Sequence, residues 1–215
     1  SKGVELMMEI LGTMFERFTQ VISASGGVID KFIGDAIMAV WNVPDSVDDP
    51  ARKAMNAVEE IMESLEELND TVFEPKMGMR MRVRIGLTFG EVFAGNVGCN
   101  ERLNYTVIGN IVNLASRLEQ LNKNFGTSVL VSDEIRAAVT TENGIDPVFR
   151  CLGFSRIHGF KNPIRVHEFV GSRRKLSPRK VVMLDHYQPI DRLFVSSPYN
   201  IPMSELPVMI KEYQS

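Results

Sequence analysis

One stretch of the chain places two charged side chains around a turn, where they could do chemistry. Residues 28–41 read VIDKFIGDAIMAVW, so two apolar, largely β-branched runs flank a Gly34-Asp35 pair. This pattern predicts a tight β-hairpin with Asp35 at its tip, where a carboxylate can meet a cation or solvent. Lys31 occupies an alternate position of a strand that is otherwise mostly apolar and expected to be buried. Two interpretations remain open on these residues alone, namely a functional pair, or a turn aspartate beside a lysine that reaches water.

A second candidate pair lies on a predicted helix. The apolar residues of 111–121 recur with helical spacing, and Asn110 is a plausible N-cap after a strand over 103–108. Asn113 and Arg117 are four residues apart, so they share one face of that helix. A strand, a glycine and a helix N-terminus together favour phosphate binding, although the signal is weak by itself. The alternative is a solvated helix face on which Arg117 pairs with a nearby acid.

Apolar periodicity predicts the elements that must position these residues. The first helix carries a stripe of apolar residues that includes its methionines, so we expect those methionines in the core. Interleaved helices and strands predict an α+β sandwich of helices on a mainly antiparallel sheet. The expected helices cover 2–23, about 50–68, 111–121 and a short segment after Ser132; the expected strands cover 28–33, 36–41, 81–88 and 91–94 as a second hairpin, 103–108, 128–131, 149–154 and 164–170.

Composition excludes several classes of protein. The chain of 215 residues has a net charge of −3 and no long basic run, which argues against a nucleic-acid partner. Its two cysteines, Cys99 and Cys151, form no CxxC pair, so neither a disulfide framework nor a zinc site is expected. No apolar run reaches the roughly 18 residues that a membrane span needs, so we expect no membrane contact by this chain itself. A cytoplasmic location follows, either free or as the cytoplasmic portion of a larger membrane protein.

The composition changes after Gly171. Residues 172–180 are basic, and the last part of the chain holds half of all the prolines. We therefore divide the chain into a domain over residues 1–171 and a Pro-rich C-terminal extension over 172–215, in which no chemistry is recognisable.

Three ordered segments resemble the catalytic domain of class III nucleotidyl cyclases. They are KFIGDAIMAVW at 31–41, RIGLTFGEVFAGNVG at 84–98 and YTVIGNIVNLASRLE at 105–119, within a similarity that runs from about Lys2 to Val170. The resemblance implies a ferredoxin-like α+β domain that works as a head-to-tail dimer with a second cyclase domain. It also implies an active site between the two subunits, where the hairpin tip of one copy meets the helix face of the other. The implied reaction converts a nucleoside triphosphate to a 3′,5′-cyclic monophosphate and pyrophosphate.

The same resemblance implies roles for the hairpin residues. Asp35 resembles one of two aspartates that bind a pair of Mg²⁺ or Mn²⁺ ions, and hard cations of this kind take oxygen ligands. Lys31 resembles the residue that reads the base, with Thr106 as its partner. An ammonium group can only donate and suits N1 of adenine, while the hydroxyl can accept from the exocyclic amine. The expected substrate is therefore ATP.

Three further residues match positions of the family pattern. Asn113 would orient the ribose, and Arg117 would stabilise negative charge on the α-phosphate during the reaction. Lys161 resembles the lysine that contacts the triphosphate, although the loop here is one residue longer. The sequence thus predicts an adenylyl cyclase. A catalytically silent cyclase-like dimerisation or nucleotide-binding module and a guanylyl cyclase are the two alternatives.

The similarity departs from the family pattern at its beginning. The family strand that carries the first metal aspartate has no counterpart after Ser1, so one metal ligand and a central strand are missing from the segment. We expect a domain that lacks this strand to have open edges and low stability. Three explanations remain: the strand lies outside the given segment, the chain is a silent cyclase in a larger assembly, or residues 181–185 supply a substitute strand and carboxylate.

Overall fold

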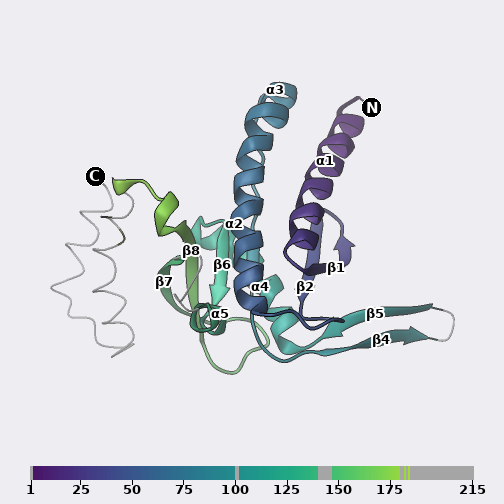
Figure 1. Cartoon of the computed structure of the whole chain (residues 1–215), viewed down its shortest axis with the longest axis vertical. Coiled ribbons are helices and arrows are strands. Elements are labelled where there is room, and N and C mark those ends of the chain that lie inside the picture. Colours follow the sequence, from purple (N-terminus) through teal and green to yellow (C-terminus); the bar gives the residue numbers. More distant parts are fainter. Residues whose placement is uncertain (1, 100–101, 140–146, 180–181, 183, 185–215) are drawn as a thin grey trace.

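The computed structural model describes residues 2–99, 102–139, 147–179, 182 and 184, and its helices and strands follow one another in the predicted order (Figure 1). The mixed α+β fold expected from the sequence is confirmed. In chain order the elements are α1 (Lys2–Ala24), β1 (Gly27–Ile33), β2 (Ala36–Trp41), α2 (Pro50–Leu68), the π-helix η1 (Asn69–Phe73), α3 (Glu74–Met77), β3 (Ile85–Leu87), β4 (Phe93–Cys99), β5 (Arg102–Ile108), α4 (Asn110–Phe125), β6 (Val129–Ser132), α5 (Asp133–Ala138), β7 (Pro147–Ser155), β8 (Ile164–Ser172) and the 3₁₀ turn η2 (Arg173–Lys175).

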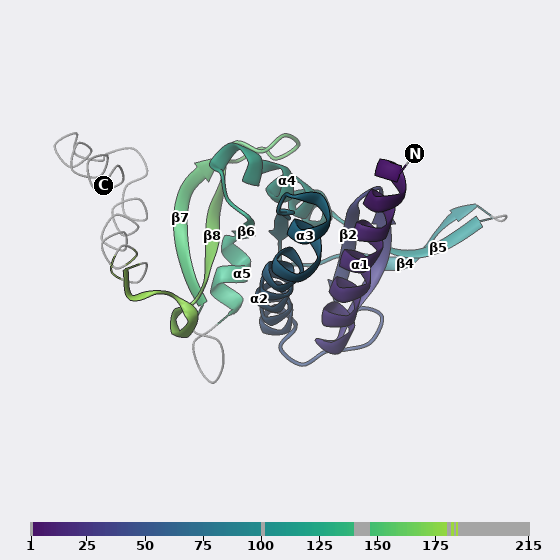
Figure 2. The same ribbon diagram turned by 90° about the horizontal axis from the view of Figure 1, so that it is seen from above.

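Helices α1 and α2 lie side by side and enclose the largest group of buried apolar residues (Figures 1 and 2). On α1 the buried stripe runs through Ile10, Met14 and Phe18, whereas Met7 and Met8 are exposed. The prediction that the methionines of this helix belong to the core is therefore wrong for these two. Apolar residues populate two adjacent helical stripes on α1, and spacing alone does not tell which stripe faces the core.

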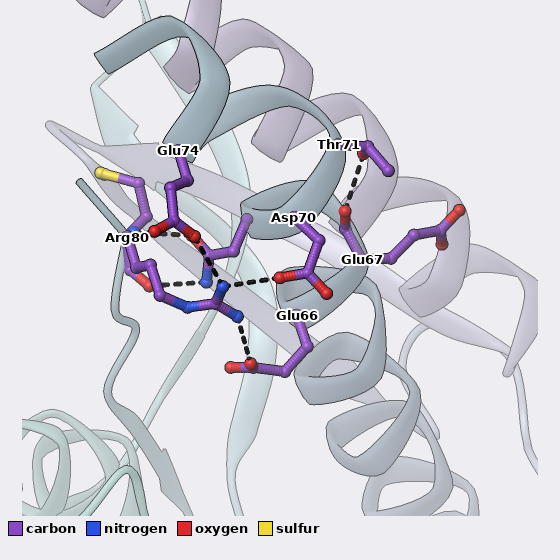
Figure 3. Close-up of polar contacts among 8 residues, drawn as sticks. Glu66, Glu67, Asp70, Thr71, Glu74 and Arg80 are labelled. Carbon is purple, nitrogen blue, oxygen red and sulfur yellow. Dashed lines mark hydrogen bonds and ion pairs between the residues drawn. The ribbon is translucent and has the colours of Figure 1, made fainter. Parts of the chain in front are cut away.

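The helical rod formed by α2, η1 and α3 continues past the predicted end of the second helix. Arg80 follows the rod and folds back against it, where its guanidinium donates to Glu66 at 2.7 Å, Asp70 at 2.6 Å and Glu74 at 2.9 Å (Figure 3). These carboxylates come from three successive turns, so one side chain holds the returning segment along the rod.

The four-stranded sheet has helices on both faces. Its order is β3-β6-β8-β7, with β3 parallel to β6 and the other pairs antiparallel. Val129 and Val131 of β6 pack with residues of α2 and α5, while Leu130 packs with Leu114 and Leu118 of α4. Strand β6 is therefore buried on both faces, and α4 is fixed against the sheet.

The predicted hairpin at 28–41 is confirmed as β1 and β2, but the predicted second hairpin is wrong. Strand β4 pairs with β5, and this ribbon projects from the rest of the chain (Figures 1 and 2). Residues 81–84 form no strand, and the Asn69 side chain bonds to both the amide and the carbonyl of Met81 at the start of this segment. Among the described residues, the β1-β2 pair, the β4-β5 pair and the four-stranded sheet are three separate hydrogen-bonded units.

A hydrogen-bonded ionisable pair, the buried His167 and the half-exposed Asp133, joins α5 to β8. His167 donates from Nε2 to Asp133 Oδ1 at 2.7 Å. Burial lowers the pKa of His167 below its ordinary value of 6.5, although the carboxylate acts in the opposite direction. Burial alone would raise the pKa of Asp133, but the hydrogen bonds from His167 and Arg136 outweigh it and lower that pKa. The folded chain therefore holds His167 neutral.

The end of β8 is fastened to α2 by a buried carboxylate. Glu59 Oε1 accepts from the backbone N–H of Ser172 at 2.9 Å and from its hydroxyl at 2.5 Å. Beyond this point the predicted extension lies mostly outside the described residues. In the segment 181–185, the two described residues, Val182 and Leu184, are helical, so neither belongs to a substitute strand. No helix in the described part of the chain is long and apolar enough to cross a membrane.

Candidate functional site

The hairpin tip presents Asp35 to solvent. Gly34 precedes it with a φ of 62°, a left-handed conformation that glycine adopts without strain. The turn closes the register between Ile33 and Ala36. Asp35 is exposed and accepts no hydrogen bond from the other described residues. Its carboxylate is therefore available to a ligand outside this chain.

Lys31 and Thr106 meet directly, although 75 positions separate them in the sequence. Lys31 Nζ donates to Thr106 Oγ1 at 3.0 Å. Thr106 is 8% exposed, while the lysine side chain is 43% exposed. The prediction that the strand of Lys31 is mostly buried is wrong, because β1 is exposed from Lys31 to Ile33. The two base-reading candidates thus lie together, with the lysine partly exposed and the threonine buried beneath it.

A third residue, which the sequence reasoning missed, completes this group. Asp30 Oδ2 accepts from Thr106 Oγ1 at 3.0 Å and lies 3.1 Å from Lys31 Nζ. Its side chain is only 3% exposed. Strict alternation would send Asp30 and Lys31 to opposite faces, but the register shifts between Ile29 and Lys31, which leaves Asp30 as the extra residue of a β-bulge. A carboxylate inside an apolar strand run was the only available signal.

Helix α4 carries the second candidate pair. The N-cap is Gly109 rather than the predicted Asn110, and no side chain caps the helix. Asn113 and Arg117 are both exposed, and within the described residues the Arg117 guanidinium contacts Gln120 Oε1 at 3.3 Å. The pair therefore lies on a solvated helix face, as the alternative expects, but no acid pairs with Arg117 among the described residues.

The position of α4 depends on the absence of a side chain at Gly86. A Cβ at this position of β3 would lie 2.0 Å from the carbonyl oxygen of Ala115 and 2.5 Å from the amide nitrogen of Glu119. Both are backbone atoms of α4, which cannot swing aside as a side chain could. Gly86 therefore permits the close contact that fixes the helix carrying Asn113 and Arg117.

Lys161 lies apart from these elements in sequence, in the loop between β7 and β8. It is exposed and has no side-chain partner among the described residues. The loop turns through Gly159 at a φ of 86°, and the Phe160 amide bonds to the carbonyl of Ile157 at 3.1 Å. A cation on this loop is free to meet an anion.

Neither of the two best-defined cavities of the described chain offers a nucleotide-sized space around these residues. A cavity of about 50 Å³ next to Asp30 is lined by Val28, Tyr105 and Val107 among others, and a larger cavity of about 490 Å³ lies elsewhere, between the end of α1 and α2. No cluster of three or more His, Cys, Asp or Glu side chains in the described residues is placed to hold a metal ion. Asp35 fits one ligand position by its chemistry, and the other ligands of such an ion must come from elsewhere.

Exposed apolar side chains surround the candidate residues. They gather on β1 and on the projecting β4-β5 ribbon, where six of them are at least 49% exposed: Phe32, Ile33, Phe93, Leu103, Tyr105 and Ile108. Exposed apolar surface of this kind lies on the same strands as Lys31 and Thr106 and is typical of interaction surfaces.

The family model of the adenylate and guanylate cyclase catalytic domain matches residues 2–171. The chain belongs to this family. The cyclase domain is 35% identical over 177 residues to adenylate cyclase 1 of Rhizobium meliloti (strain 1021), covering 82% of this chain and 26% of that protein. It is 32% identical over 187 residues to the terminal-differentiation-specific adenylate cyclase of Dictyostelium discoideum, covering 86% of this chain and 8% of that protein.

Solved structures of both cyclase types resemble the cyclase domain. The adenylyl cyclase CyaB from P. aeruginosa superposes with a TM-score of 0.70 at 26% identity, covering 80% of this chain and 86% of that chain. The guanylyl cyclase Cya2 gives a TM-score of 0.67 at 27% identity, covering 80% and 84%. The chain spans about a quarter or less of the two curated relatives. The nucleotide that the cyclase domain uses must therefore be argued from its own residues.

Proposed function

We propose that the protein is an adenylyl cyclase that converts ATP to 3′,5′-cyclic AMP and pyrophosphate at the interface of two cyclase domains. The observation that carries the proposal is the hydrogen bond between Lys31 and Thr106 in a domain of this family. An ammonium donor beside a hydroxyl acceptor matches the acceptor at N1 of adenine and the donor at its exocyclic amine. Guanine has a donor at N1 and an acceptor at O6, so in the same position it opposes both groups.

The reaction forms a bond between the ribose 3′-oxygen and the α-phosphorus and breaks the bond from that phosphorus to the bridging oxygen of pyrophosphate. The 3′-hydroxyl gives up its proton, and the electron pair of the broken bond leaves with pyrophosphate. Arg117 would stabilise the negative charge that builds on the α-phosphate oxygens, a task for a planar and permanently charged group. Asn113, one turn earlier on the same helix, would hold the ribose, and Lys161 would meet the β- and γ-phosphates.

The exposed carboxylate of Asp35 suits a divalent cation. Asp35 would supply one oxygen ligand to Mg²⁺ or Mn²⁺, and in the two-ion arrangement of the family the triphosphate, water and a further carboxylate would supply the others. Such ions, when bound, make the 3′-hydroxyl more acidic and neutralise charge on the phosphates. The part played by Asp35 itself is to fix the position of an ion at the hairpin tip.

A second copy of the domain would complete the site. The described chain carries Lys31, Asp35, Asn113 and Arg117, and neither of its two best-defined cavities offers a nucleotide-sized space around them. The exposed apolar residues of β1 and of the β4-β5 ribbon lie on the same strands as the base-reading pair and suit burial against a partner. In a two-fold arrangement, the hairpin of each copy would face α4 of the other, which gives two equivalent sites.

Cyclic nucleotide formation by the full-length protein tests the proposal. We expect cyclic AMP from ATP with Mn²⁺ or Mg²⁺, and much less cyclic GMP from GTP. Asp35→Ala and Arg117→Ala should each lower the rate by about 10²- to 10³-fold or more, because each removes a charge directed at the reacting phosphates. The exposed Asp45 and the half-exposed Arg17, which pairs with Glu67, provide matched controls, and Asp45→Ala and Arg17→Ala should retain the wild-type rate.

Four outcomes contradict the proposal in different ways. Full activity of Asp35→Ala would remove the metal assignment, while full activity of Arg117→Ala would remove the phosphate assignment. A preference for GTP would make the protein a guanylyl cyclase, a result compatible with its similarity to Cya2. Nucleotide binding without any product would favour the silent binding module.

A further inference from the structure

We propose that Asp30 is a specificity-determining positioning residue, which selects adenine by fixing the direction of the Thr106 hydroxyl. The inference rests on the proposed function, because it concerns the base that the same site accepts. It starts from the closed triangle of contacts among Asp30, Lys31 and Thr106, whose three distances lie between 3.0 and 3.1 Å.

The hydrogen-bonding capacities of the three groups leave one arrangement. A carboxylate can only accept, an ammonium can only donate, and a hydroxyl has one proton and two lone pairs. The Thr106 proton must therefore go to Asp30, since Lys31 cannot accept it. One lone pair of Thr106 accepts from Lys31, and the other remains for a ligand.

The groups left over define the ligand edge that fits. Lys31 uses one N–H on Thr106 and directs another towards Asp30, so a third N–H is free. The triangle therefore offers a ligand one donor and one acceptor whose direction cannot reverse. Adenine matches with N1 and its amine, whereas guanine in the same position places N1–H against the donor and O6 against the acceptor.

Without Asp30, the Thr106 hydroxyl could rotate. Its proton would then be free to donate to guanine O6, so half of the mismatch would disappear. Burial makes the constraint strong, because water has little access to a carboxylate that is 3% exposed and cannot replace it as an acceptor. Asp30 need not touch the nucleotide to produce this effect.

Two substitutions separate the acceptor from its charge. Asp30→Ala removes the acceptor, and we expect the ratio of kcat/KM for ATP over GTP to fall by about tenfold or more, the effect of one oriented hydrogen bond. Asp30→Asn should retain most of the ratio. The hydrogen bond from Thr106 and the ion pair with Lys31 both converge on Oδ2, so a single amide oxygen at that position can accept from both groups, and the described residues donate nothing to Oδ1.

A double-mutant comparison tests whether Asp30 acts through Thr106. Thr106→Val should lower the ATP to GTP ratio by itself, and Asp30→Ala should then change it by less than about twofold. Glu59→Gln is the matched control, because Glu59 is another buried carboxylate that accepts from a hydroxyl but lies away from the base-reading pair. This control should leave the ratio unchanged.

Binding and turnover are measured on the same full-length variants. Calorimetry with 3′-deoxy-ATP and 3′-deoxy-GTP, which cannot cyclise, should give the same loss of selectivity for Asp30→Ala as kinetics does. If the wild type binds these analogues but makes no cyclic nucleotide, the proposed function is wrong. The ratio of its affinities for the two analogues, compared with that of Asp30→Ala, still tests the role of Asp30. If Asp30→Ala keeps the wild-type ratio while Thr106→Val lowers it, or if neither analogue binds the wild type, the inference is overturned.

Discussion

Removing the Glu59 carboxylate should destabilise the fold at the junction between α2 and the end of β8. Glu59 and Ser172 are 7% and 1% exposed, and both hydrogen bonds from Ser172 converge on the Oε1 atom. In Glu59→Ala, the backbone N–H and the hydroxyl of Ser172 remain buried without this acceptor. Lys175 lies 3.5 Å from Oε2 but is half exposed, so its ion pair contributes little.

The expected loss follows from the two orphaned donors. Each buried donor left without a partner costs about 1–3 kcal/mol, so the two donors in Glu59→Ala should lower the free energy of unfolding by about 2–6 kcal/mol. Ser172→Ala loses only the hydroxyl contact and should cost about 1–2 kcal/mol. Glu59→Gln keeps an oxygen for both donors and should cost about 1 kcal/mol or less, the difference between a charged and a neutral acceptor.

Urea unfolding of the three variants, followed by circular dichroism, measures these differences. The predicted order of destabilisation is Glu59→Ala, then Ser172→Ala, then Glu59→Gln. An ordinary domain has a free energy of unfolding of about 5–15 kcal/mol, so the first variant should lose a large part of its stability. If Glu59→Ala unfolds within about 0.5 kcal/mol of the wild type, water satisfies Ser172 and the reasoning from burial is wrong.

Three further predictions concern other parts of the molecule. Gly86→Ala should lower the free energy of unfolding by about 1–3 kcal/mol or more in urea titrations, because the added Cβ meets the backbone of α4. It should also lower cyclase activity, and a variant with wild-type stability and activity would contradict this contact. His167 has a lowered pKa in the folded chain, so the unfolded chain binds a proton at this residue first, and the free energy of unfolding should fall as the pH drops below 6.5. His167→Gln should flatten this dependence on pH in urea titrations, and an unchanged dependence would exclude His167 as its source. Leu103→Arg should weaken self-association in analytical ultracentrifugation, since it places a charge on the exposed apolar ribbon, and an unchanged dissociation constant would exclude this ribbon from the interface.

The order of elements and the α+β class could be predicted because apolar periodicity is local. The hairpin turn at Gly34-Asp35 needed only neighbouring residues, and the buried stripe of α2 follows a simple helical repeat that includes Val58 and Leu65. The pairing of β4 with β5 instead of β3 could not be predicted in this way. It depends on contacts between distant residues: β3 pairs with β6 instead, and the side chain of Asn69 holds the backbone of Met81.

The same distinction between local patterns and contacts of distant residues applies to the candidate site. Lys31 and Thr106 could be paired only through family resemblance, and the structure brings their side chains into contact. Asp30 was not predicted, because strict alternation places its side chain on the face opposite Lys31. A β-bulge that no local sequence pattern indicates turns both side chains toward Thr106. The roles of Asp35, Asn113, Arg117 and Lys161 remain predictions, since these exposed side chains await a ligand or a second copy.

Mixing two inactive variants tests the central claim that each site is shared between two copies. Asp35→Ala spoils the hairpin and Arg117→Ala spoils the helix, so a mixed dimer keeps one site with an intact hairpin from one copy and an intact helix from the other. Random pairing should restore cyclic AMP formation to about a quarter of the wild-type rate, because half of the dimers are mixed and each has one of two sites. If the mixture shows the mixed dimer by mass spectrometry but stays as inactive as its components, the site is not shared in this way.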